Sequence, residues 1–198
     1  MTVGDRQKLI TEIVATVLNE RAQEGIFFEW FINKHKREHF GKHFITIDEI
    51  FTSLNGNRQA SQTKQTMKLK CDAYFGGRYN FIFEFDEHQH FSSARLETFN
   101  FYPIDLKVNF SIERWKQLCK THKDKADKYR EKRKTKDFNF KGGRTAQRAY
   151  FDCFRDLLPE INGLQPTLRI NNFEVEDIYS NKKEAYNKIE KLLTTKIT

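Results

Sequence analysis

Cysteine is scarce in this sequence, and its positions are far apart. The 198 residues include only Cys71, Cys119 and Cys153, and no two of them stand at the C-x-x-C spacing of zinc and redox sites. An odd number of isolated thiols gives no disulfide framework either. We therefore expect a protein of a reducing compartment such as the cytoplasm.

Long apolar segments are also missing. No stretch is long enough to span a bilayer, and Asp5, Arg6 and Lys8 interrupt the region where a signal peptide would be apolar. The sequence shows neither internal repeats nor low-complexity tracts. Hydrophobic residues nevertheless make up 38% of the chain, which suffices for a buried core in one domain. We expect no membrane partner.

Acidic residues are too few to balance the basic ones, and the imbalance is concentrated in one segment. The formal net charge at pH 7 is +8, and the isoelectric point is about 9.3. Residues 114–148 contain 14 Lys or Arg and 4 Asp or Glu, so the rest of the chain carries a net charge of −2. A field of this sign favours a polyanionic partner, with nucleic acid ahead of an anionic membrane surface.

The hydrophobic pattern predicts mixed secondary structure. Helices are expected over 5–24 (ended by Gly25), 26–40, 46–54 (capped by Thr46), 111–136, 144–158 (ended by Pro159) and 182–194. Strands are expected in an acidic hairpin over 69–90 and over 104–110, 167–171 and 173–179, with a surface loop over 55–66. Ser92 or Ser93 can cap a short helix. This order predicts an α/β (α+β) domain with a basic helical insertion.

The hairpin places acidic residues where a strand would otherwise be apolar. Alternate residues of a strand share a face, so Glu84 and Asp86 point away from the phenylalanines of 81–85, and Asp72 on the preceding strand could lie beside them. Converging carboxylates repel one another and are costly to desolvate, and a hard divalent cation relieves both effects. The alternative is a row of solvent-facing acids on an edge strand. The pattern favours a Mg²⁺ site.

The hairpin resembles the signature of the PD-(D/E)XK nuclease superfamily. That signature has an acid on one strand, a short turn and then, on the next strand, acid-x-Lys or a variant with Gln, Asp or another residue in the last place. Asp72 matches the first acid and Glu84 the second, within residues 65–103. The resemblance implies the restriction-endonuclease-like fold, a central mixed sheet flanked by helices, over a single domain 1–198. It also implies that Asp72, Glu84 and the carbonyl of Phe85 bind Mg²⁺, or Mn²⁺ in its place, for phosphodiester hydrolysis.

One position departs from that signature. Asp86 stands where the superfamily usually has Lys, and residues 84–90 look more like its Glu-x-Asp-Gly-x-x-His branch, with Glu87 in place of the Gly. Asp86, Gln89 or His90 is then expected to orient or deprotonate the attacking water. The alternatives that stay open are the registration Glu87-x-Gln89 and a contribution from Glu12 or Glu20 of the first helix.

The domain is expected to consist of N-terminal helices (1–60), a catalytic hairpin and sheet (66–110), a basic helical segment that binds DNA (111–158), and C-terminal strands with a helix (159–198). Gly-Gly-Arg-Thr at 142–145 offers donors for a phosphate at a helix N-terminus. The alternative for the basic segment is a solvated helix whose acids pair with neighbouring Lys and Arg. The residues expected to contact DNA are Lys123, Lys125, Lys128, Arg130, Lys132, Arg133, Lys134, Lys136, Lys141, Arg144, Gln147 and Arg148.

A second metal motif competes with the hairpin. His35 to His39 spells H-x-x-E-H, the inverted zincin pattern, in which the two histidines share a face of a helix. Lys36 and Arg37 would place cations beside the zinc, and no downstream helix supplies a clear acidic third ligand. We therefore favour an exposed basic helix end over a peptidase.

These features lead us to expect a Mg²⁺-dependent endodeoxyribonuclease, of the type II restriction class or its small cleavage subunit, in the cytoplasm of a prokaryote or a phage-infected cell. A chain of this size leaves little room for a recognition domain, and one site cuts one strand. We therefore expect a homodimer or a partner subunit on double-stranded DNA. The alternatives are a non-catalytic nucleic-acid-binding protein that kept the fold, and a nuclease acting on RNA or branched DNA.

Overall fold

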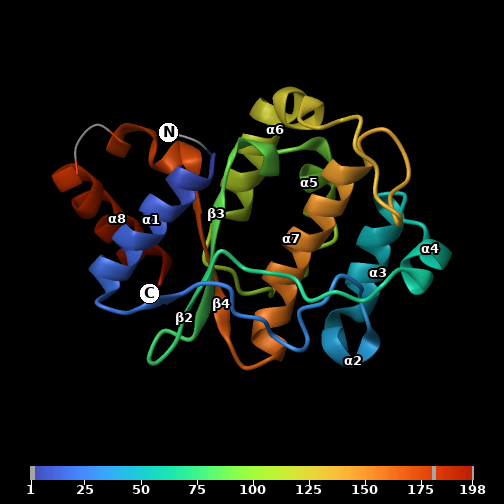
Figure 1. Ribbon diagram of the computed structural model, residues 1–198, viewed down its shortest axis with the longest axis horizontal. Coiled ribbons are helices and arrows are strands. Elements are labelled where there is room, and N and C mark those ends of the chain that lie inside the picture. Colours follow the sequence, from blue (N-terminus) through green and yellow to red (C-terminus); the bar gives the residue numbers. More distant parts are fainter. Residues whose placement is uncertain (1–2, 180–181, 198) are drawn as a thin grey trace.

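A four-stranded mixed sheet lies between two layers of helices in the computed structural model, which describes residues 3–179 and 182–197 (Figure 1). In spatial order the strands are β1 (Ala22–Gln23), β2 (Ala73–Phe75), β3 (Phe81–Asp86) and β4 (Gln165–Asn171). Neighbouring strands are antiparallel from β1 to β3, and β3 and β4 are parallel. The predicted mixed α/β class, with a mixed sheet flanked by helices, is confirmed.

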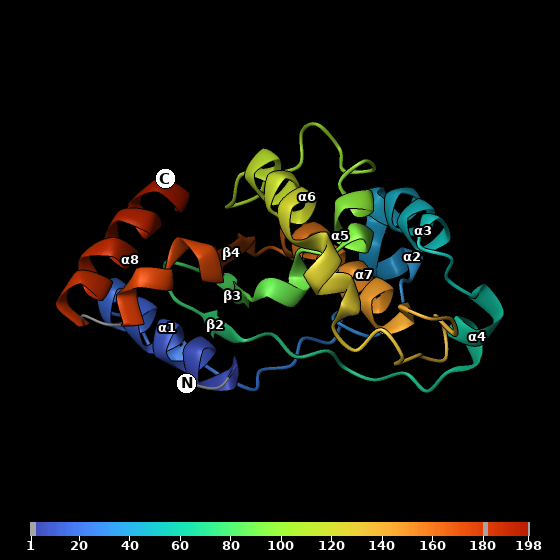
Figure 2. The same cartoon turned by 90° about the horizontal axis from the view of Figure 1, so that it is seen from above.

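Helices cover both faces of this sheet. α1 (Val3–Leu18) and α8 (Lys182–Lys196) cover one face, and α7 (Gly143–Ile161) crosses the other (Figures 1 and 2). The remaining helices are α2 (Arg37–Phe40), α3 (Phe44–Ser53), α4 (Arg58–Thr63), α5 (Ser93–Thr98) and α6 (Ile112–Lys128), with short 3-10 helices at Gly41–His43, His88–His90, Asn172–Glu174 and Glu176–Tyr179. Within the described ranges, no helix has the length and apolar character needed to cross a membrane.

The two faces of β3 enter different cores, as its alternating sequence predicts. The phenylalanines of 81–85 pack with Ile13 of α1 and Ile189 of α8. Ile82 faces the other way and packs with Phe154 of α7. Glu84 and Asp86 lie on the Ile82 side of the strand, so the acidic face of the hairpin is turned toward α7 rather than toward solvent.

Helices with strong local signals form close to where the sequence predicts them. α3, α6 and α8 lie within or close to the expected ranges, although Thr46 lies inside α3 instead of capping it and α6 ends at Lys128 rather than near 136. The hydroxyls of Ser92 and Ser111 cap α5 and α6 by accepting backbone N–H groups. α1 ends at Leu18 rather than near Gly25, because Asn19 adopts a left-handed conformation (φ 49°) that stops the helix.

The helix predicted over 26–40 is wrong. Only Arg37–Phe40 is helical, and the preceding residues form turns and one antiparallel bridge, from Ile32 to Lys68. Leu69 N–H donates to Phe31 O at 2.7 Å, and Asn33 N–H donates to Met67 O at 2.9 Å. Pairing with a segment remote in sequence therefore overrides the helical spacing of the aromatic residues.

Three other local predictions are also wrong. The expected loop over 55–66 contains α4, whose N-cap is Asn57. Residues 104–110 form no strand beyond a single bridge from Asn109 to Leu168. Residues 173–179 are 3-10 helical, because the side chain of Asn171 accepts the N–H groups of Phe173 and Glu174 and ends the strand.

Pro159 does not end α7, which continues to Ile161. A proline removes the hydrogen bond to the carbonyl four residues earlier, here that of Arg155. Thr167 Oγ1 of β4 donates to that carbonyl at 2.6 Å instead. A strand residue thus satisfies the acceptor that the proline leaves free, and the helix extends across the sheet.

Candidate active site

A polar cavity of about 210 Å³ lies between the β2–β3 hairpin and α7. It is lined by Gln7, Asp72, Glu84, Phe85, Glu87, His90, Arg144, Arg148, Phe151, Asp152 and Arg155. Six of these residues are among those predicted from the sequence to belong to the site or to bind DNA. The cavity therefore brings the acidic hairpin and part of the basic segment to one place.

Asp72 and Glu84 are held side by side by backbone hydrogen bonds of the hairpin. Phe85 N–H donates to Asp72 Oδ2 at 2.8 Å, and Asp72 N–H donates to Glu84 Oε1 at 3.3 Å. Asp72 Oδ1 and Glu84 Oε2 make no hydrogen bond within the described ranges. Each of the two carboxyl groups thus keeps one oxygen that no hydrogen bond of the described residues occupies.

Burial makes the charges of these two acids costly. It raises the pKa of Asp72 to about 6 and that of Glu84 to about 8, and repulsion between the two groups adds to the shift of Glu84. The nearby Arg155 opposes the rise in both groups without cancelling it. Two adjacent acids with raised pKa values form a set of hard oxygen donors that a divalent cation would stabilise.

Arg155 of α7 is the cation nearest to these acids. Its Nε lies 2.7 Å from Glu84 Oε1, and one of its terminal nitrogens donates to Lys70 O at 2.8 Å. Its side chain is largely buried, with its guanidinium over the ring of Phe31. Sequence reasoning missed this residue, since the predicted basic contacts stop at Arg148.

Arg155 belongs to a row of charged residues along one face of α7. Arg144, Arg148, Asp152 and Arg155 follow one another at spacings of four, four and three, which places them on one side of a helix. Burial lowers the pKa of Arg144 and Arg148, and their neighbouring arginines lower it further. The helical spacing was visible in the sequence and could have identified both Asp152 and Arg155.

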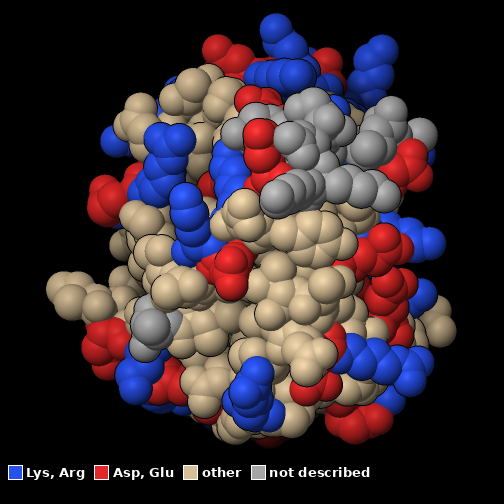
Figure 3. Space-filling model, turned by 90° about the vertical axis from the view of Figure 1, so that its left-hand side faces the viewer, with Lys and Arg blue, Asp and Glu red and all other residues tan. Residues whose placement is uncertain are grey.

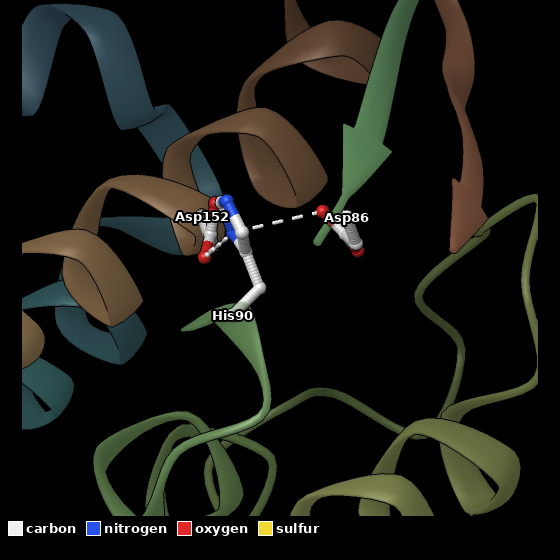
Figure 4. Close-up of side chains that lie close together, drawn as sticks. All are labelled: Asp86, His90 and Asp152. Atoms are coloured by element: carbon white, nitrogen blue, oxygen red, sulfur yellow. Dashed lines mark hydrogen bonds and ion pairs between the residues drawn. The ribbon is translucent and has the colours of Figure 1, made fainter. Parts of the chain in front are cut away.

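The three residues proposed to replace the usual lysine lie in different surroundings. Asp86 is buried and does not line the cavity: Arg169 donates to its Oδ1 at 2.6 Å and Trp115 Nε1 donates to its Oδ2 at 2.8 Å. Gln89 is also buried, and its Nε2 donates to Glu87 Oε2 at 2.5 Å. His90 alone of the three lines the cavity, and its Nδ1 lies 2.9 Å from Asp152 Oδ2 (Figure 4).

A network of buried ion pairs lies behind the cavity. Arg169 of β4 contacts Asp86, Asp152 and Asp156, and Arg95 of α5 donates to Asp156 Oδ2 at 2.6 Å. Although burial opposes it, these two arginines hold the pKa of Asp156 below its usual value. The network joins β3, β4, α5 and α7 and fixes the position of Asp152.

The N-terminus of α7 does not offer the phosphate donors expected at 142–145. The N–H groups of Gly142, Gly143 and Arg144 donate to carbonyls of the preceding segment, those of Glu131, Phe140 and Arg133. A Cβ at Gly143 would lie 1.9 Å from Phe138 O, so a glycine is needed there for close backbone packing. The Gly-Gly pair is therefore structural.

The other predicted DNA-contacting residues are spread over α6 and the loop that follows it. Lys123, Lys125 and Lys128 are exposed on α6, and Arg130, Lys132, Arg133 and Lys134 are exposed after it. Lys136 donates to Thr63 O, and Gln147 donates to Asp137. Lys141 forms an ion pair with Glu131. The side of the molecule that carries α1 and α8 shows both charge signs around a broad uncharged area (Figure 3).

The competing metal motif does not form a ligand set. His35 precedes α2, so the helical spacing of the motif is lost. Its Nδ1 lies 2.6 Å from the hydroxyl of Tyr150 and its Nε2 lies 3.1 Å from Asp48 Oδ1. Glu12 of α1 is exposed, and neither it nor Glu20 lines the cavity, to which α1 contributes Gln7.

Comparison with protein families gives one match, to a family model described as a family of unknown function, over residues 49–194. Neither the curated proteins nor the solved structures include a significant match to this chain. The matched range covers well over half of the chain and every cavity residue except Gln7. The chain belongs to the family of unknown function DUF7255.

Proposed function

We propose that this protein is a Mg²⁺-dependent endodeoxyribonuclease of the PD-(D/E)XK type. Asp72 and Glu84 are the residues whose substitution tests this proposal most directly. The observation that carries the proposal is that the buried Glu84 and the partly buried Asp72 share one cavity with three arginines of α7. Acids of raised pKa suit a divalent cation, and arginines suit the phosphates of a nucleic acid. The mixed sheet between helices agrees with the architecture that the superfamily resemblance implies.

The donors around Asp72 fit Mg²⁺. One free oxygen from each of Asp72 and Glu84, with the carbonyl of Phe85, would hold the ion, and Mn²⁺ offers the same preference for oxygen. When bound, the ion would activate a water and offset the charge that develops on the phosphate. Arg144 and Arg148, farther along α7, would bind the phosphates next to the scissile bond.

The exposed lysines and arginines of α6 and the following loop support double-stranded DNA as the substrate. They extend the positive charge beyond the cavity, and such charges contact the backbone without regard to sequence. A single cavity cuts one strand, so the proposal includes a homodimer or a partner subunit for a double-strand cut. The setting that we propose is the cytoplasm of a prokaryote or of a phage-infected cell, in a restriction system.

A second candidate is a non-catalytic nucleic-acid-binding protein, and one observation favours it. Arg155 is already paired with Glu84, and Arg169 is already paired with Asp86. Two of the hairpin acids thus already form ion pairs with arginines of the protein. In this alternative the arginines of α7 bind nucleic acid and no bond is cut.

Supercoiled plasmid incubated with Mg²⁺ distinguishes the two candidates. We expect cleavage by the wild type that EDTA abolishes, and a loss of about a hundredfold or more in Asp72→Asn or Glu84→Gln, because a metal contributes several kcal/mol to the transition state. Glu12→Gln is the matched control, since it removes an exposed acid outside the cavity.

Binding of plasmid without cleavage, with either Mg²⁺ or Mn²⁺, would support the second candidate and exclude the nuclease on duplex DNA. The same assay on single-stranded RNA and on a four-way DNA junction tests the remaining substrates. Cleavage of one of these alone, with the same dependence on Glu84, would keep the site and change the substrate.

A further inference from the structure

His90 is placed between two buried carboxyl groups at the rim of the cavity. It follows β3 in a 3-10 turn, and its Nδ1 lies 2.9 Å from Asp152 Oδ2 and 3.7 Å from Asp86 Oδ1 (Figure 4). Its side chain is 19% exposed and lines the cavity that also contains Asp72 and Glu84. The ring is therefore buried on its Nδ1 side and open toward the cavity.

The surroundings of His90 decide which ring nitrogen carries the proton of the neutral imidazole. Asp152 lies against both His90 and Arg169, which hold the pKa of its carboxyl below its usual value although burial opposes this, so it accepts hydrogen bonds and has no proton to donate to Nδ1. Nδ1 must then be the N–H donor to Asp152. Nε2 makes no hydrogen bond to any residue that the structure describes, and in this tautomer it keeps its lone pair.

We propose that His90 is the general base of the reaction and that Asp152 is its positioning residue, an inference that rests on the proposed nuclease function. Nε2 takes one proton from the attacking water as the water oxygen forms its bond to phosphorus. The bond from phosphorus to the leaving sugar oxygen breaks with its electron pair, and that oxygen takes a proton from solvent. The imidazolium then returns its proton to solvent, so the protein is unchanged.

The same three side chains, Asp86, His90 and Asp152, lie close enough together to suggest a metal site. Two contacts oppose that assignment. Arg169 Nη1 lies 2.6 Å from Asp86 Oδ1, so a protein cation already pairs with this member of the cluster. The nitrogen of His90 that faces the cluster is engaged with Asp152. Arg169 compensates the negative charge of the cluster. The ring nitrogen of His90 without a hydrogen-bond partner among the described residues is Nε2, on the side of the ring away from the cluster.

Replacement of His90 with Ala tests the base directly. We expect cleavage to fall about 10² to 10⁴-fold, the usual contribution of a general base, and added imidazole to restore part of it. Glu84→Gln is the matched control, because imidazole cannot replace a metal ligand. A purely structural role for His90 predicts a loss that imidazole does not reverse.

Asp152→Asn tests the positioning role. The amide oxygen of Asn is expected to face Arg169, which leaves the amide N–H₂ toward His90 and forces Nδ1 to accept. The proton then moves to Nε2 and the base is lost, so kcat should fall with little change in KM. Circular dichroism of the variant confirms that it is folded.

Long-range ¹H–¹⁵N NMR of the His90 ring gives a readout that needs no activity. We expect a protonated Nδ1 in the wild type and a protonated Nε2 in Asp152→Asn. A wild-type ring protonated at Nε2, or full cleavage by His90→Ala, would overturn the base role while leaving the proposed function intact. A wild type that cuts no substrate would overturn the proposed function, and the base role with it.

Discussion

The proposed metal binding requires Glu84 to be ionised, whereas the folded protein is more stable when this buried group is protonated. Burial raises its pKa from 4.5 to about 8, so between these values the folded protein holds a proton that the unfolded chain has lost. The free energy of unfolding attributable to Glu84 therefore falls as pH rises through this window. Urea denaturation should show a smaller decrease from pH 5 to pH 8 in Glu84→Gln than in the wild type. Parallel pH profiles for the two proteins would contradict the raised pKa.

Binding of Mg²⁺ at Asp72 and Glu84 should instead increase the free energy of unfolding. An ion that binds only the folded protein stabilises it by about 2.7 kcal/mol at a hundred times its Kd. We expect this gain to grow toward pH 8, where Asp72 and Glu84 are ionised, and to vanish in the Asp72→Asn, Glu84→Gln double variant. Urea denaturation with and without Mg²⁺ measures it, and an equal gain in the double variant would place the ion elsewhere.

At the scale of single residues, the sequence predicts the half of the site that lies in one hairpin. Asp72 and Glu84 are twelve positions apart and meet because a tight turn joins their strands, which is a local relation. The partners Asp152 and Arg155 come from a helix that begins almost sixty residues after β3. No local pattern specifies that contact, so the surroundings of Asp86 and His90 could not be inferred from the hairpin alone.

At the scale of elements, α7 is the helix that we expect to hold nucleic acid against the acids. Replacing both Arg144 and Arg148 with Gln removes two cations, so the slope of log Kd against log salt should decrease by about two units, at roughly 0.9 per phosphate contact. Fluorescence anisotropy of labelled DNA over a range of KCl measures the slope. The matched control is Arg21→Gln with Lys191→Gln, which removes two exposed charges outside the cavity. An equal change in the control would mean that only net charge matters.

Elements whose ends are set by nearby residues were predicted better than those set by tertiary pairing. Ser111 caps α6 from the adjacent position, and the location of that helix follows from the sequence. The segment 26–40 has a helical pattern, yet Phe31 pairs with Leu69, far along the chain. Pro159 is a strong local stop signal that fails only because Thr167 of a neighbouring strand supplies the missing hydrogen bond.

At the scale of the whole molecule, the layers are joined by charge as well as by apolar contact. The face of the sheet toward α1 and α8 is apolar, with the phenylalanines of β3 at its centre. The face toward α5 and α7 carries the buried acids Asp86, Asp152 and Asp156 around Arg169. Such a network contributes little net stability when complete, but it is costly to break. Its position directly behind His90 ties the geometry of the cavity to the assembly of the layers.

Arg169→Met should therefore destabilise the whole fold rather than one segment. Removing the guanidinium takes the arginine partner from Asp86 and Asp152 and leaves Asp156 with Arg95, and breaking a buried pair in this way costs about 3–5 kcal/mol. The loss should be largest at neutral pH and should shrink in acid, where the freed carboxyl groups take up protons instead of staying charged. Urea denaturation of Arg169→Met and of the exposed control Arg21→Met, each at pH 5 and pH 7, measures both effects. A loss at pH 7 no larger than that of the control would show that the network does not join the layers of the protein.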